Sequence, residues 1–90
     1  MSDDMKTEID CLYETVAALS SKEDCKDLFE DLCTYKEIEA MAQRLQAAKL
    51  LLEGETYEKI ILKTGISSAT LSRVNRCVKY GNGYKKSCKK

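Results

Sequence analysis

Apolar residues recur at helical spacing along most of the 90-residue chain. The repeat is clearest near the start, where intervals of four, three, four and three positions separate Met5, Ile9, Leu12, Val16 and Leu19. This spacing predicts a helix over residues 5–19. Ser21, followed by Asp24 three positions later, resembles a capping box and predicts a second helix over residues 22–32. The inward face of that helix would carry Cys25, Leu28, Phe29 and Leu32.

A longer helix is predicted over residues 35–53, opened by a capping box at Thr34 and Glu37 and closed by Gly54. Its main apolar stripe comprises Ile38, Met41, Leu45, Ala48 and Leu52. Additional apolar residues leave the second half of the helix apolar on almost every side, so most of its surface has to be covered. A chain of this size has few elements to do so, and we expect coverage by its own chain and by a second subunit. A fully covered monomeric core is the alternative.

Two helices joined by a tight turn at Gly65 are predicted over residues 57–63 and 68–80. Thr56 and Ser67 provide hydroxyl groups that can cap the two helices. The buried stripe of the second helix would consist of Leu71, Val74 and Val78.

The opposite face of that second helix is small and polar at its start and basic further on. It carries Ser68, Ser72 and Arg76, flanked by Ala69, Arg73 and Lys79. Such a face suits a helix whose N-terminal end enters the major groove of DNA while its later turns meet phosphates. A helical hairpin with an ordinary solvated face is the alternative interpretation.

Charge is distributed unevenly along the chain, although the formal net charge is zero. Residues 1–39 contain twelve acidic and four basic residues, whereas residues 73–90 contain seven basic residues and no acidic one. A basic end that continues the candidate DNA-reading helix is compatible with nucleic-acid binding. The acidic part is accounted for as a solvated surface.

The composition favours an all-α fold in one small domain, because proline is absent and good helix formers are abundant. No apolar run approaches the length of a membrane span, and the acidic N-terminal sequence does not resemble a signal peptide. We therefore expect a cytoplasmic protein that does not bind membranes.

Little in the sequence indicates catalysis or a metal centre. The chain has no histidine, and no C-x-x-C pair occurs among Cys11, Cys25, Cys33, Cys77 and Cys88. Reduced thiols are expected, with a redox role left open. The chain also lacks a paired-carboxylate constellation and a phosphate-binding glycine loop, so we do not expect an enzyme.

Two segments between Leu28 and Tyr84 read LFEDLCTYKEIEAMAQRLQAAKLLLEGETYEKI and TGISSATLSRVNRCVKYGNGY. They resemble the Trp repressor superfamily, and in particular the Trp-repressor-related YerC/YecD family of bacterial proteins. The resemblance implies an all-α fold of five to six helices and an intertwined homodimer. Each subunit would offer a helix-turn-helix to successive major grooves of a palindromic operator.

On this basis we expect a single Trp-repressor-like helical domain over residues 1–90. Residues 1–53 would form the dimerisation helices and residues 56–80 the helix-turn-helix. Residues 81–90, with two glycines and a run of lysines, would form a flexible basic tail.

The resemblance also implies roles for individual residues in binding double-stranded DNA. It places Ser68, Ala69 and Ser72 near base edges, and Lys59 and Thr70 at the DNA backbone. Together with their neighbours, the expected DNA-binding residues are Lys59, Ser67, Ser68, Ala69, Thr70, Ser72, Arg73 and Arg76.

A small-molecule effector pocket is implied only in part. Thr34, Arg44 and Arg73 match positions of the tryptophan pocket of the Trp repressor, including the two arginines that flank the ligand. Val74 replaces a glycine next to the indole and would occupy volume that the ring needs, and Cys77 replaces a serine. We expect L-tryptophan to bind weakly or not at all and predict no cofactor; the arginines would make structural contacts or hold another small anion.

The sequence thus predicts a sequence-specific DNA-binding transcriptional regulator, a repressor, that acts as a homodimer. The alternative is an all-α dimeric protein–protein interaction module with weak or non-specific DNA binding.

Overall fold

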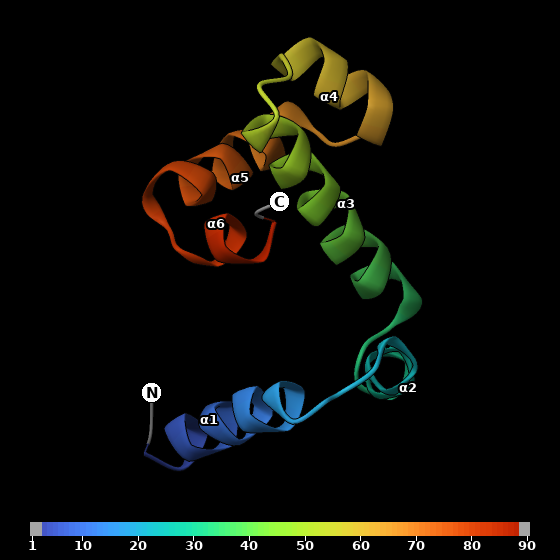
Figure 1. Ribbon diagram of the computed structural model, residues 1–90, viewed down its shortest axis with the longest axis vertical. Coiled ribbons are helices and arrows are strands. Elements are labelled where there is room, and N and C mark those ends of the chain that lie inside the picture. Colours follow the sequence, from blue (N-terminus) through green and yellow to red (C-terminus); the bar gives the residue numbers. More distant parts are fainter. Residues whose placement is uncertain (1–2, 89–90) are drawn as a thin grey trace. The chain divides into compact units, whose positions relative to one another are not determined.

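A computed structural model describes residues 3–88, which form six helices and, within that range, no strand. The helices are α1 (Asp3–Ala17), α2 (Lys22–Leu32), α3 (Tyr35–Leu52), α4 (Tyr57–Thr64), α5 (Ser68–Tyr80) and α6 (Gly83–Ser87), as Figure 1 shows. The predicted all-α class is confirmed, and the five predicted helices are present with ends within two residues of those expected. None of the helices in the described range combines the length and apolar character that a membrane crossing requires.

The chain divides after Tyr35 into two compact units. The first unit contains α1 and α2, and neither helix has a buried residue. The predicted cap of α2 is confirmed, because the Asp24 backbone N–H donates to Ser21 Oγ over 3.0 Å. Leu12 on the apolar stripe of α1 is 40% exposed, so this unit does not bury its own apolar surface.

The second unit contains the hydrophobic core. Its eight buried residues come from α3, α4, the turn after α4, and α5: Ala47, Ala48, Leu50, Ile60, Ile66, Leu71, Val74 and Val78. The stripe predicted for α5 is confirmed in full. Ala47 and Ala48 are both fully buried, so this side of α3 is covered by the rest of the second unit.

The buried face of α3 differs from the stripe predicted for it. Ala48 is buried, but Leu45 and Leu52 are 39% and 42% exposed, and Ala47 and Leu50 are buried in their place. The helix is apolar on almost every side in this half, so periodicity alone does not select the side that faces its own chain. The exposed leucines are apolar surface that the second unit by itself leaves uncovered.

Glycines end α3 and α4 in the way that the sequence predicts. Gly54 has a φ of +86°, and the N–H groups of Gly54 and Glu55 donate to the carbonyls of Leu51 and Leu50. This pair of bonds is the Schellman arrangement, which satisfies carbonyls that the helix end would otherwise leave unpaired. Gly65, with a φ of +74°, ends α4 through one bond from its N–H to the Ile61 carbonyl.

Helix α6 lies in the segment for which we predict a flexible tail. Tyr84 packs against the core, and α6 contacts α5. Lys85 Nζ donates to the Lys79 carbonyl over 2.8 Å, which ties α6 to the C-terminal end of α5. The two glycines of this segment indicate flexibility only if no side chain anchors it, and Tyr84 provides such an anchor. The last two lysines of the predicted tail lie outside the described residues.

Replacing Leu71 by alanine is expected to destabilise the fold by about 2–5 kcal/mol, the usual cost of truncating a buried leucine. Its side chain is 0% exposed, whereas that of Leu62 is 85% exposed, so Leu62→Ala is the matched control. Urea unfolding followed by circular dichroism compares the two variants with the wild type. An L71A midpoint equal to that of the wild type would contradict this description of the core.

Candidate nucleic-acid interface

A short turn that several hydrogen bonds stabilise joins α4 to α5 in the second unit. The Ile66 side chain is buried in the core, and its backbone N–H donates to Thr64 Oγ1 over 3.2 Å. The Thr64 hydroxyl in turn donates to the Ile60 carbonyl over 2.7 Å. These bonds order the turn that precedes α5. Figure 1 shows α4 and α5 gathered at the C-terminal end of α3.

Both predicted caps of the two helices are confirmed. The Lys59 backbone N–H donates to Thr56 Oγ1 over 3.3 Å at the start of α4. At the start of α5, the Thr70 N–H donates to Ser67 Oγ over 3.2 Å, and the Ser67 hydroxyl donates to Thr70 Oγ1 over 2.9 Å. The two hydroxyl groups at the start of α5 are therefore engaged with each other, which holds them in place on the first turn.

The residues predicted to contact DNA lie on the surface of α4 and α5. Those that the structure leaves exposed are Lys59, Ser67, Ser68, Ala69, Ser72, Arg73 and Arg76, while Thr70 is half-buried. The face of α5 opposite the core thus begins with small side chains and continues with guanidinium groups. Such a face leaves room for a base edge near the helix start and brings donors to phosphates further along.

A second basic residue of α4, Lys63, is paired within the chain. Its Nζ lies 3.6 Å from Oε2 of Glu55, in the segment between α3 and α4. Lys59, which lies one turn earlier on the same helix, forms no ion pair with any other residue in the range 3–88. The two lysines of α4 are thus in different electrostatic surroundings.

Gln43 of α3 is a functional candidate that sequence reasoning missed. Its Nε2 donates to the Thr64 carbonyl over 3.0 Å and so connects α3 to the turn of the helix-turn-helix. The bond joins residues 21 positions apart, and periodicity does not report such a contact. The sequence does not single out Gln43, because α3 contains other polar residues close to it, among them Arg44 and Gln46.

Comparison with known proteins decides the family. The sequence profile of the Trp repressor protein family matches residues 7–89. This chain belongs to the Trp repressor family. Uncharacterized protein YerC from Bacillus subtilis (strain 168) is 51% identical over 75 residues, which are 83% of this chain and 72% of YerC. The predicted resemblance is confirmed.

Solved structures share the fold of this Trp repressor family member. A TrpR like protein from Eubacterium eligens ATCC 27750 has a TM-score of 0.84 and 43% identity, covering 89% of this chain and 84% of that one. A Staphylococcus aureus protein has the same TM-score of 0.84 and 38% identity, covering 96% of this chain and 90% of its own. The Trp-repressor-like fold is therefore shared beyond the helix-turn-helix.

The residues predicted to form an effector pocket lie in different units and differ in their burial. Thr34 lies in the first unit, and the others lie in the second. Val74 is 2% exposed and belongs to the core, Arg44 is half-buried, and Arg73 and Cys77 are exposed. The Val74 side chain is thus packed among core residues. It fills space beside the α5 backbone that a glycine would leave empty.

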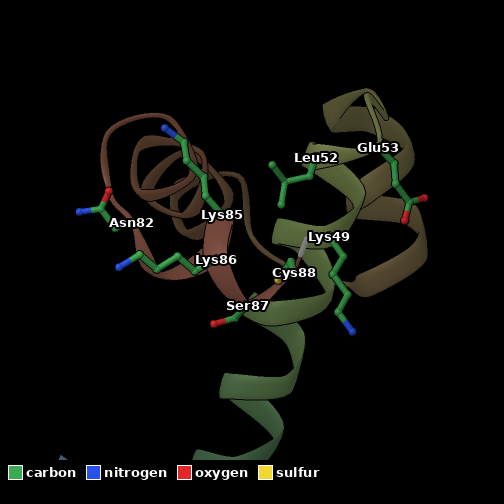
Figure 2. Close-up of a pocket in the computed structure, with 8 residues that line it drawn as sticks. All are labelled: Lys49, Leu52, Glu53, Asn82, Lys85, Lys86, Ser87 and Cys88. Atoms are coloured by element: carbon green, nitrogen blue, oxygen red, sulfur yellow. The ribbon is translucent and has the colours of Figure 1, made fainter. Parts of the chain in front are cut away.

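Two cavities of the second unit adjoin α6. The larger, of about 950 Å³, lies between α6 and the end of α3 and is lined by Lys49, Leu52, Glu53, Asn82, Lys85, Lys86, Ser87 and Cys88. Figure 2 shows Leu52 directed toward α6, while the ammonium groups of Lys49 and Lys86 point outward. The smaller, of about 410 Å³, includes Cys77, whereas Arg44, Arg73 and Val74 line neither cavity.

Metal ligands are not gathered anywhere in residues 3–88, since no group of three His, Cys, Asp or Glu side chains there could hold an ion. The five cysteines are free thiols. The exposed face of α5 offers hydroxyl groups that can form hydrogen bonds and guanidinium groups that carry positive charge.

Added L-tryptophan is expected to bind weakly or not at all, because the resemblance places the buried Val74 next to the indole, where its side chain would fill volume that the ring needs. The chain contains no tryptophan, so the emission of added tryptophan measures its distribution in equilibrium dialysis. Equal concentrations on both sides are expected. The Val74→Ala variant removes two methyl groups and so tests whether the volume of the Val74 side chain is what prevents binding. Micromolar binding by the unaltered chain would contradict this prediction.

Proposed function

We propose that this chain is a sequence-specific DNA-binding transcriptional regulator, a repressor that acts as a homodimer through its helix-turn-helix. The observation that carries the proposal is the exposed face of α5. This face is small and polar at the helix start and basic beyond it, while the opposite face is anchored in the core. The repressor assignment follows the family to which the chain belongs.

In the proposed complex, the N-terminal end of α5 enters the major groove. Ser68, Ala69 and Ser72 approach base edges, where a hydroxyl group donates or accepts and the Ala69 methyl group contacts a thymine methyl. Lys59 of α4 and the arginines of α5 contact phosphates, which supply affinity without reading sequence. Ser67 and Thr70 hold the first turn through their mutual hydrogen bond.

The apolar surface that each of the two units by itself leaves exposed supports dimerisation. Leu12 and Val16 of α1 are exposed, and so are Leu45 and Leu52 of α3. A second copy would cover such surface on both helices, since a small domain gains stability by sharing a core. Two reading helices related by a twofold axis would then meet two half-sites about one helical turn apart.

An all-α protein–protein interaction module is the second candidate. The observation that favours it is the start of α5, where Ser68 and Ala69 cannot make the bidentate contacts that arginine, asparagine or glutamine make with a base. In that case, binding to a protein would vary little with salt, and binding to DNA would be absent or uniform across sequences.

Lys59→Ala is expected to weaken binding to every DNA sequence and to lower the dependence of log affinity on log salt by about one unit per contact. Fluorescence anisotropy with a labelled duplex over a series of salt concentrations measures both effects. Lys36→Ala, a change at an exposed lysine near the start of α3, is the matched control. Ser72→Ala is expected to alter the preference among sequences instead. If K59A and S72A bind all DNA like the wild type, the proposed roles are wrong.

Leu12→Lys is expected to shift the dimer toward monomer, because it places a charge within the exposed apolar stripe of α1. Glu14→Lys is the control, since a residue two positions further on points to another side of the helix. Sedimentation velocity over a range of concentrations measures the monomer fraction. A Leu12→Lys variant that dimerises as tightly as the wild type would exclude α1 from the interface.

A further inference from the structure

The turn of the helix-turn-helix is attached to α3 by one side chain. Gln43 Nε2 donates a 3.0 Å hydrogen bond to the Thr64 carbonyl, and both residues are half-buried. Gln43 and Thr64 both belong to the second unit, so the bond acts within one compact body.

The Thr64 carbonyl is well suited to receive such a bond. Thr64 is the last residue of α4, and the carbonyls of a final helical turn lack an N–H partner within the helix. The neighbouring groups of the turn are already paired, since the Gly65 N–H donates to Ile61 and the Ile66 N–H to the Thr64 hydroxyl. Gln43 thus satisfies an acceptor at the point where the chain changes direction.

The hydrogen bond adds a directional constraint to the apolar packing that holds α5. Ile60, Ile66 and Leu71 hold α4 and α5 against α3, but hydrophobic attraction is not directional. A hydrogen bond weakens steeply when its geometry is distorted. The bond from Gln43 therefore favours one position of the turn, and with it one orientation of α5.

We propose that Gln43 is a positioning residue that clamps the helix-turn-helix to α3 and so fixes the orientation of α5 for DNA. The part that concerns DNA rests on the proposed function, whereas the clamp itself is a property of the free protein. Gln43 is half-buried and engaged with the Thr64 carbonyl, so the assignment requires no contact between Gln43 and a base or phosphate.

Gln43→Met and Gln43→Glu test the clamp in the full-length chain. Methionine keeps a similar length but donates no hydrogen bond, and glutamate places an oxygen opposite the Thr64 carbonyl. Gln46→Met is the matched control, because Gln46 is an exposed glutamine on the same helix. Gln43→Lys returns an N–H donor to the position and serves as the rescue variant.

Amide hydrogen exchange is the first readout. The amides of Gly65 and Ile66 are expected to exchange about 3- to 10-fold faster in Gln43→Met, the range that follows from losing one hydrogen bond. The amide of Ala48, within α3, is expected to keep its wild-type rate, because local opening does not require global unfolding. Gln46→Met is expected to change neither rate, and Gln43→Lys to restore slow exchange in the turn.

DNA affinity, measured by fluorescence anisotropy, is the second readout. Affinity is expected to fall by a similar factor in Gln43→Met and to stay unchanged in Gln46→Met. Unchanged exchange at Gly65 and Ile66 in Gln43→Met, or equal acceleration at Ala48, would overturn the clamp. Faster exchange in the turn with unchanged DNA affinity would overturn the role in orienting α5. If the wild type binds no DNA, the proposed function fails, and the exchange rates still decide the clamp.

Discussion

The burial of one face of α5 in the same core as two alanines of α3 is the constraint on which the second unit depends. Leu71, Val74 and Val78 are buried together with Ala47 and Ala48, and this burial leaves the opposite face of α5 in solvent. The same helix thus provides core on one side and the candidate DNA-reading surface on the other. Ile66 extends the core into the turn, so the start of α5 is held by packing as well as by the cap at Ser67.

The first unit differs from the second, because its two helices form no buried core of their own. Neither α1 nor α2 buries a residue, yet α1 carries a regular apolar stripe. An apolar stripe on an amphipathic helix favours association, and the exposed leucines of α3 are a further surface of the same kind. These observations support the homodimer that we propose and that the Trp repressor family suggests.

The sequence could predict the structural features that depend on residues close to one another along the chain. The caps at Ser21, Thr56 and Ser67 follow from local hydroxyl chemistry, and the stripe of α5 follows from its period. The buried side of α3 could not be predicted in the same way, because the second half of this helix is apolar on almost every side. Helix α6 depends on Tyr84 reaching the core, and the clamp depends on Gln43 reaching a carbonyl 21 residues away. The DNA-contacting roles of the α5 residues stay predictions, since their exposure is compatible with them but does not test them.

The central claim is that the exposed face of α5 reads a DNA sequence in a dimeric complex. The most direct measurement is the capture of sheared genomic DNA by the purified full-length chain at moderate salt, followed by sequencing. The account predicts enrichment of a short inverted repeat whose half-sites lie about one helical turn apart. Uniform recovery of DNA that fades with rising salt, or no recovery, would contradict sequence-specific reading by this helix.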